Sequence, residues 1–228
     1  MPEQEPRTGS RPTPSSSTVA DAPALVGLTS SGDLSAWTDA GFAVDGAGLR
    51  LGSVSIRTAE TPGAAGIVAW SLTGVDDGVV DGLLTLEAAG TPAPGPTDHP
   101  NTTTAIDHLV VASPHLDRTT EAFGALGIEL RRVRDAGRME QRFFRIGEVI
   151  LELIGQPGAE GPGPATFWGL ALTVADIDAA AALLGDRLGP VTDAVQPGRR
   201  IATLRHEAVG VPVPVAFLSP PPPRPSPP

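Results

Sequence analysis

The stretch DHLVVASPHLDRTTEAFG (residues 107–124) matches a second stretch, WGLALTVADIDAAAALLG (residues 168–185), without a gap. Each begins with a short apolar run, passes through a turn, and continues into a segment opened by acidic or hydroxyl residues. This order is typical of a strand followed by a helix, and we expect the helices near 116–126 and 177–187. The alignment pairs Leu109 with Leu170, Leu116 with Ile177, Asp117 with Asp178 and Gly124 with Gly185.

Three extended runs follow each predicted helix, separated by glycines that suit turns. In the first copy they are IELRRVR (128–134), QRFFRIG (141–147) and EVILELIG (148–155). In the second copy they are VTDAVQ (191–196), RRIATLRH (199–206) and VPVPVAFLS (211–219). The repeated unit is therefore βαβββ, and the sequence predicts an α+β fold.

A degraded version of the same unit precedes it. LRLGSVSIRTA (49–59) parallels FFRIGEVILELI (143–154), and GIVAWSLTGVDDGVVDGL (66–83) resembles the opening of a module with too few residues after it. Composition divides the rest, because Pro-, Ser- and Gly-rich segments cannot bury enough apolar surface to form a core. We expect a disordered tail at 1–22, a degenerate module pair at 23–87, a linker at 88–104, two full modules at 105–218 and a Pro-rich tail at 219–228.

Composition excludes several classes of function. The net charge of -10 argues against nucleic acids and anionic membranes as partners, and no apolar stretch is long enough to span a membrane. The absence of cysteine excludes thiolate chemistry and fits a reducing compartment, so we expect a cytoplasmic protein. All 16 basic residues are arginine, which also excludes a Schiff-base lysine.

The quoted repeat, together with FFRIGEVILELIG (143–155), resembles the vicinal oxygen chelate superfamily, which includes glyoxalases, bleomycin-resistance proteins and extradiol dioxygenases. The resemblance implies paired βαβββ modules whose curved, mixed sheet encloses a cleft. It also implies a divalent metal in that cleft, held by residues on the first and last strands of each module.

Carried over residue by residue, the resemblance places one metal ligand on His108 and another on Glu152. The matching positions of the second module are Gly169 and Ala216, whose side chains cannot coordinate, so the implied metal site is incomplete. In the first part of the chain the matching places are near Ala24 and at Arg57. We therefore expect no cofactor or a weakly held divalent metal.

His108 and Glu152 leave several interpretations open. His108 is either a ligand, a catalytic base or a hydrogen-bonded residue of the cleft. Glu152 faces either the cleft or solvent, because the sequence does not reveal the face of the sheet. Additional donors are Gln141, Gln196, His206 and Glu207, whereas His99 and His115 fall in a linker and a turn, where we expect them to be solvated.

Arginines near the same strands are candidates for binding an anionic group, since guanidinium pairs bidentately with carboxylates and phosphates. Arg199 and Arg200 follow a Pro-Gly turn and are the strongest pair, and Arg138, Arg142 and Arg145 are further candidates; the alternative is a solvated surface. Phe144 and Trp168, with Phe143 and Phe167, line either an apolar cleft or the core.

The sequence thus predicts a glyoxalase-like protein that acts on or binds a small organic molecule, with self-association possible. If it is an enzyme, His108 and Glu152 are its catalytic residues in a lyase, isomerase or dioxygenase. The alternative is a binding or sequestration protein without metal. Arg199, Arg200, Phe144 and Trp168 are the predicted ligand-binding residues.

Overall fold

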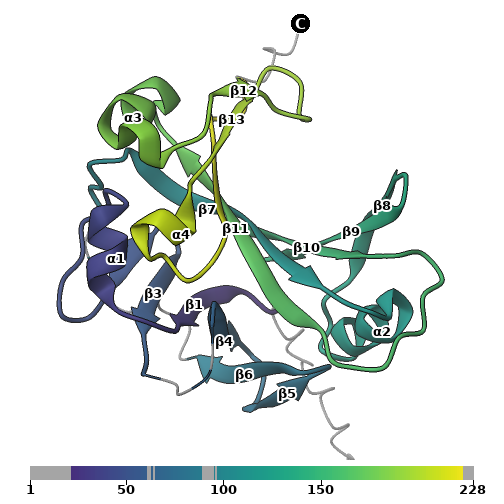
Figure 1. The fold of residues 1–228 in the computed structure, drawn as a ribbon. Helices are drawn as coiled ribbons and strands as arrows, with labels where there is room; N and C mark the ends of the chain where they lie inside the picture. Colours follow the sequence, from purple (N-terminus) through teal and green to yellow (C-terminus); the bar gives the residue numbers. More distant parts are fainter. Residues whose placement is uncertain (1–21, 61–62, 64, 89–94, 96, 223–228) are drawn as a thin grey trace, which may run out of the picture.

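The computed structural model describes residues 22–60, 63, 65–88, 95 and 97–222, which form two mixed β-sheets with short helices (Figure 1). The expected α+β fold of paired modules is confirmed. Most of both predicted tails, and residues 89–94 and 96 of the predicted linker, lie outside the described residues.

The elements of the first part are β1 (Leu25–Ser30), α1 (Leu34–Asp39), β2 (Leu49–Leu51), β3 (Val54–Thr58), β4 (Ile67–Thr73), β5 (Gly78–Val80) and β6 (Leu83–Ala88). Those of the second part are β7 (Thr103–Ala112), α2 (Leu116–Ala125), β8 (Leu130–Ala136), β9 (Met139–Ile146), β10 (Val149–Gly155), β11 (Thr166–Val174), α3 (Ile177–Leu184), a 3-10 turn (Gly185–Arg187), β12 (Thr192–Asp193), β13 (Arg200–Thr203), α4 (His206–Val209) and β14 (Val215–Leu218).

The eight-stranded sheet has the order β12-β13-β14-β11-β7-β10-β9-β8 and contains both full modules. The two first strands, β7 and β11, lie antiparallel at its centre, and each pairs in parallel with the last strand of its own module. Leu109 lies directly opposite Leu170, the residue that the sequence repeat equates with it. The two modules are therefore related by an approximate two-fold axis through this pair.

The six-stranded sheet repeats this pairing in shortened form. Strands β1 and β4 are antiparallel neighbours, β1 pairs in parallel with β3, and β4 pairs in parallel with β6. Only α1 remains as a helix among its described residues, since β4 leads directly through a short turn into β5. The degraded module pair expected before the full pair is thus present.

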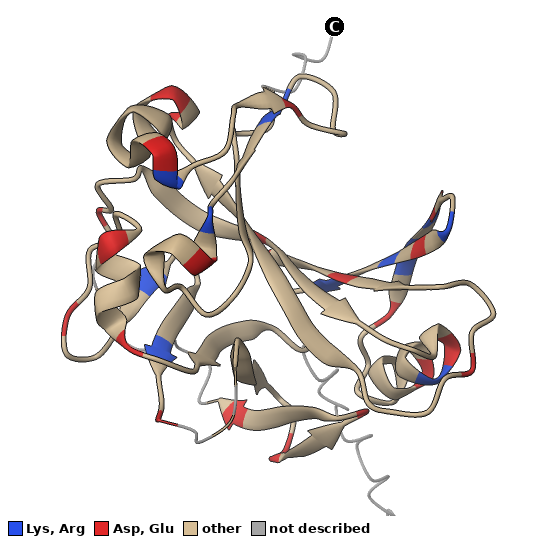
Figure 2. Ribbon diagram, in the orientation of Figure 1, with Lys and Arg blue, Asp and Glu red and all other residues tan. Residues whose placement is uncertain are grey.

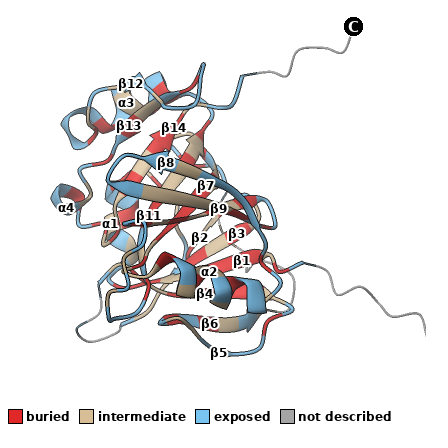
Figure 3. Cartoon of the chain, turned by 90° about the vertical axis from the view of Figure 1, so that its right-hand side faces the viewer, coloured by how far each residue is buried: buried red, intermediate tan, exposed pale blue. Residues whose placement is uncertain are grey.

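The two sheets share one hydrophobic core. Trp70 of the six-stranded sheet packs against Phe123 of α2 and Phe167 of β11, with ring centroids 5.9 and 5.6 Å apart. On the eight-stranded sheet, alternate residues such as Leu109 and Leu151 are fully buried on this side. The opposite face of that sheet is concave, with β12 and β13 along one side and β8 and β9 along the other (Figure 1). The edge strand β8 is largely exposed (Figure 3).

The expectation that His99 is solvated in a linker was wrong. Its side chain is only 7% exposed, and its ring packs edge-on against Phe42 at 5.5 Å. Its Nδ1 accepts a hydrogen bond from the Ala43 amide at 3.2 Å, and Nε2 lies 3.0 Å from the Arg50 carbonyl. The neighbouring prolines and threonines indicated a loop correctly, but they gave no sign that the loop packs against the segment before β2.

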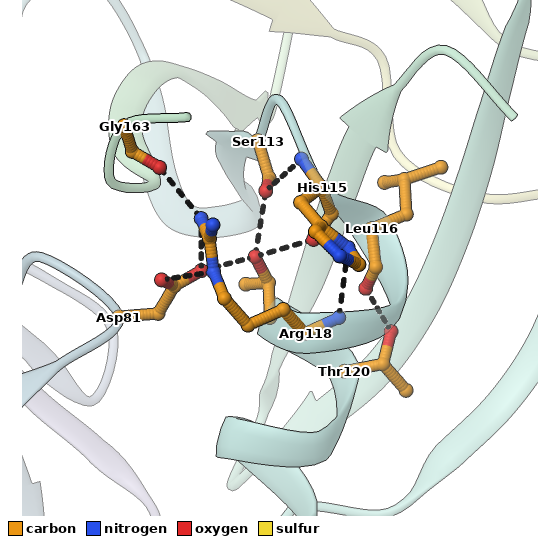
Figure 4. A network of polar contacts seen from close by, with 8 residues as sticks. Asp81, Ser113, His115, Leu116, Arg118, Thr120 and Gly163 are labelled. Atoms are coloured by element: carbon orange, nitrogen blue, oxygen red, sulfur yellow. Dashed lines mark hydrogen bonds and ion pairs between the residues drawn. The ribbon is translucent and has the colours of Figure 1, made fainter. Parts of the chain in front are cut away.

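A polar network centred on Asp81, in the turn between β5 and β6, joins the two sheets (Figure 4). The carboxylate accepts hydrogen bonds from Arg118 Nε at 2.7 Å and from the Thr119 hydroxyl, both on α2. Arg118 also donates to the Gly163 carbonyl at 2.6 Å. Asp81 has φ of +45°, a conformation that Asp and Asn adopt more readily than most residues. His115 accepts from the Arg118 amide as the N-cap of α2, so its role here is to start the helix.

Candidate functional site

The candidate site lies on the concave face of the eight-stranded sheet. Strand alternation brings His108 and Val110 of β7 to this face together with Ile150 and Glu152 of β10, their neighbours in register. Two adjoining cavities of about 740 and 280 Å³ open here, and His108 and Phe143 line both.

A β-bulge turns Asp107 toward the same cleft as His108. Opposite this point the register shifts, so that Ala171 faces His108 and Leu172 faces Ile106, and Asp107 is the extra residue. Its carboxylate lies 2.6 Å from His108 Nδ1 and 2.9 Å from Arg199 Nη1, and it accepts a hydrogen bond from the Thr173 hydroxyl at 3.1 Å. Burial alone raises the pKa of Asp107, but His108 and Arg199 outweigh it and lower the pKa to about 2. Asp107 therefore stays ionised beside the imidazole.

This arrangement fixes the imidazole of His108. The side chain is 8% exposed, and Phe143 packs against the ring at 6.4 Å. The contact of Nδ1 with Asp107 Oδ2 is close but does not have hydrogen-bond geometry, so it is an electrostatic contact between the carboxylate and this ring nitrogen. Among the described residues no hydrogen bond reaches Nε2, and His108 lines both cavities. A carboxylate at Nδ1 with a free Nε2 is an arrangement suited to accepting or donating a proton at Nε2.

Glu152 lies on the concave face rather than in solvent on the opposite side. Its neighbours Leu151 and Leu153 point the other way and are fully buried. Glu152 lines the smaller cavity and accepts a hydrogen bond from the Gln141 amide at 2.7 Å. Burial raises the pKa of Glu152, and the charges of His108 and Arg134 with the Gln141 bond offset part of that rise. In the described structure no direct hydrogen bond joins Glu152 to His108.

Arginines surround the larger cavity. The five that line it are Arg131, Arg132, Arg134, Arg145 and Arg199. Arg199 is paired with Asp107 and Arg131 with Glu129, but no described carboxylate lies within 4.0 Å of Arg132, Arg134 or Arg145. Basic segments of β8 and β9 beside the concave face are visible in Figure 2. Three arginines without a described carboxylate partner thus border one cleft of a protein whose net charge is -10.

Three of the arginines that the sequence suggested for anion binding lie outside the cleft. Arg142 faces the opposite side of β9 and pairs with Glu140 and Asp117. Arg200 is exposed and pairs with Asp178 at 2.7 Å, and Arg138 lies in the exposed turn between β8 and β9. Arg132 and Arg134 were not among the candidates from sequence, although alternation along IELRRVR places both on one face of a strand.

The aromatic candidates from the sequence also divide into residues that line the cleft and residues that lie elsewhere. Phe143 lines both cavities, and Arg132 lies over its ring at 6.0 Å. Phe144 borders the larger cavity, but its side chain is 2% exposed and packs against Phe123 in the core. Trp168 is 53% exposed and lines none of the cavities described for this face.

The donor set does not fit a three-ligand metal site. No group of three His, Asp or Glu side chains placed to hold a metal occurs among the described residues. In the second module, register places Gly169 and Ala216 at the ligand positions, as the repeat predicted. In the six-stranded sheet, the residue matching His108 in register is Gly27, not one near Ala24.

The additional donors do not complete this set. Gln141 is bonded to Glu152, and His206 lies in α4 with Nδ1 3.0 Å from the Val211 carbonyl, next to exposed Glu207. Gln196 is exposed and lines both cavities. The Asp107 carboxylate beside His108 is engaged by Arg199 and Thr173. Among the described residues this leaves His108 and Glu152 as donors at one place, fewer than the protein ligands of an ordinary catalytic metal.

Comparison with known proteins agrees with this architecture. Residues 105–205 match the family described as Glyoxalase/Bleomycin resistance protein/Dioxygenase superfamily. This part of the chain is therefore a domain of the vicinal oxygen chelate superfamily. No curated protein matches the chain.

Two solved structures share the fold over most of the chain. A mutant of 4-hydroxymandelate synthase from Streptomyces coelicolor is 15% identical, with 86% of this chain and 92% of that chain covered and a TM-score of 0.58. A xylose isomerase-like TIM barrel/4-hydroxyphenylpyruvate dioxygenase fusion protein is also 15% identical, with coverage of 86% and 49% and a TM-score of 0.58. Methylmalonyl-CoA epimerase from Mycobacterium tuberculosis is 20% identical over 53% of this chain and 91% of that chain, with a TM-score of 0.43. At these identities the likeness concerns the fold alone.

None of the helices in the described residues is long and apolar enough to cross a membrane.

Proposed function

We propose that the concave cleft of this domain binds a small organic anion. The observation that carries the proposal is the set of three arginines, Arg132, Arg134 and Arg145, which line the 740 Å³ cavity without a described carboxylate partner. Guanidinium groups bind carboxylates and phosphates through paired hydrogen bonds, and a cleft shields such contacts from water better than an open surface does. Cations that only kept the protein soluble would not need to gather around one cavity.

Proton transfer at His108 is a second candidate function. Its support is the contact between Asp107 and Nδ1, because an ionised carboxylate at one ring nitrogen favours the proton there and leaves Nε2 able to accept another. Arg199 and Thr173 hold Asp107 in place from the other side. An anion bound by the neighbouring arginines would bring its acidic C–H or hydroxyl group near this nitrogen. Binding without chemistry is the alternative, and it uses the same cleft.

A divalent ion at this place would have His108 Nε2 and Glu152 as protein ligands, with water completing the coordination. Two ligands hold an ion weakly, since catalytic zinc sites ordinarily have three. The proposed binding and proton transfer require only the chain's own side chains.

Isothermal titration calorimetry against small carboxylates and phosphate monoesters tests the binding. We expect at least one class to bind, with affinity that falls as ionic strength rises. Arg134→Gln should weaken binding about tenfold or more. Arg205→Gln is the matched control, because Arg205 is exposed and lines none of the cavities described for this face. Equal affinities in the two variants, or no binding of any anion by the wild type, would overturn the proposal.

Exchange of ligand protons with deuterated water separates chemistry from binding. If His108 transfers protons, the wild type should catalyse deuterium incorporation into a bound ligand, and His108→Gln should bind the ligand but lose the exchange. Binding without exchange in the wild type would leave a sequestration protein.

A further inference from the structure

A third cavity, of about 490 Å³, occupies the opposite end of the concave face. It lies four residues along β7 from His108, at Ala112. Ala112 is opposite Ile154 of β10 and Thr166 of β11. Met139 and Pro164 also line it. In contrast to the arginine-rich cavity, its lining in the described structure includes no ionisable side chain.

The walls of this third cavity are held in place by the backbone. The Ser113 amide donates to the Ile154 carbonyl at 2.9 Å, and the Gly161 amide donates to the Pro114 carbonyl at 3.0 Å. The Ala165 amide donates to the Asp81 carbonyl at 2.8 Å, which fixes the loop before β11 to the other sheet. The cavity is therefore a formed part of the fold rather than a gap beside a free loop.

The side chains of β7 and β9 change in character from one end of the face to the other. Along β9, alternate residues run from Arg145 through Phe143 and Gln141 to Met139. At the rise of an extended strand, the four residue steps from His108 to Ala112 span roughly 13 Å. A molecule long enough to span this distance would contact the arginines, pass His108 and Glu152, and reach the apolar end.

We propose that the ligand of this cleft is an amphipathic organic anion, with its acid group among the arginines and an apolar tail in the 490 Å³ cavity. This inference rests on the proposed anion binding and names the class of ligand. Charge complementarity sets the orientation, because Arg132, Arg134 and Arg145 line the larger cavity and no ionisable side chain of the described residues lines the apolar one. The tail is held by removal of apolar surface from water.

The test is calorimetric binding of straight-chain carboxylates and alkyl phosphates of increasing length, each below its micelle concentration. Affinity should rise by about twofold to fourfold per methylene until the apolar cavity is filled. Alkyltrimethylammonium ions of equal length should not bind, because they place a cation among the arginines.

One variant, with a matched control, tests the apolar end of the cleft. Ile154→Thr should remove most of the dependence on chain length while short anions bind as in the wild type. Val133→Thr is its control, since Val133 is another β-branched strand residue, is 49% exposed and lines none of the three cavities. Melting curves of both variants establish that the fold is intact.

The outcomes separate this inference from the proposed function. Binding of short anions with no effect of chain length would overturn the amphipathic class and leave anion binding in place. Long-chain binding that Arg134→Gln leaves unchanged would overturn the proposed orientation. Failure of every anion to bind would overturn both.

Discussion

His108 Nδ1 lies 2.6 Å from Asp107 Oδ2, although the two residues are consecutive in β7. In a regular strand, consecutive side chains point to opposite faces, so Asp107 would lie on the side of the core. The bulge opposite Ala171 and Leu172 instead brings both side chains to the cleft. The candidate site thus depends on one irregularity of the sheet as well as on the identity of its residues.

Asp107→Asn should change the tautomer of His108. In the wild type the carboxylate favours the proton on Nδ1, whereas an amide can donate to Nδ1 and so favours the proton on Nε2. The ¹⁵N shifts of the imidazole report this directly. Asp186→Asn, an exposed substitution in the 3-10 turn after α3, should leave these shifts unchanged. The same spectra for Asp107→Asn and wild type would show that Asp107 does not orient the ring.

Asp107 should also make the stability of the protein depend on pH in the acid range. Its pKa is about 2 in the folded protein and near 3.8 when unperturbed, so the folded state binds this proton less readily than the unfolded state. The contribution is complete above about pH 4 and is lost as the pH falls through about 2; its size is on the order of 1–2 kcal/mol. Urea unfolding between pH 6 and pH 2, roughly the range over which carboxylates titrate, should show a shallower decline for Asp107→Asn. If the free energy of unfolding declined equally in the wild type and in Asp107→Asn, the lowered pKa of Asp107 would be contradicted.

Glu152→Gln should stabilise the protein at neutral pH. Burial raises the pKa of Glu152, so the ionised form is unfavourable in the folded state and stability falls as the pH rises from the unfolded pKa through the folded one. Glutamine removes this charge and can still accept the Gln141 hydrogen bond. Its gain in melting temperature should be present at neutral pH and absent in acid, where Glu152 is protonated. Glu121→Gln, on the exposed face of α2, should show no such pH dependence.

Protein purified without added metal should contain well under one divalent ion per chain. Gly169 and Ala216 replace the ligands that the second module would otherwise supply, and two donors alone bind weakly. Elemental analysis measures the content. A stoichiometric metal that disappears in His108→Ala would overturn this prediction and show that other groups complete the coordination.

Asp81→Asn should weaken the polar contacts between the two sheets. Asparagine tolerates the positive φ of this position and keeps the shape, but it loses the charge that faces Arg118. Because Arg118 is 36% exposed, the expected loss is only about 1–2 kcal/mol in the free energy of unfolding. Denaturant unfolding measures it against Asp76→Asn, an exposed control in the preceding turn. A loss equal to that of the control would mean that the network contributes little.

The order of elements was predictable because it is repeated. Helices expected near 116–126 and 177–187 occur at Leu116–Ala125 and Ile177–Leu184, and the three strands after each helix overlap the expected runs. The short helix α4 was not predicted. A repeat reveals such a pattern twice, and the second copy shows which apolar positions recur. In the structure, Leu109 and Leu170, which the ungapped match equates, lie opposite each other in β7 and β11.

The site was less predictable because its members come together through tertiary structure. Asp107 could not be singled out, since strict alternation assigns it to the other face. The pairing of Arg142 with Asp117, and of Arg200 with Asp178, depends on where α2 and α3 pack. Arg132 and Arg134 would have been candidates if it had been known which face of β8 lines the cleft. The sequence of an exposed edge strand does not indicate that face.

Trp70 has a consequence for any attempt to isolate the region that matches the superfamily. Its ring covers Phe123 and Phe167, and across the same core Phe42 packs against Phe217. A fragment beginning at residue 103 would present these aromatic side chains to water and would tend to aggregate. The first sheet, which contributes no residue to the histidine and arginine cleft, thus acts as the other half of a single cooperative folding unit, and a cleft variant should be studied in the intact chain.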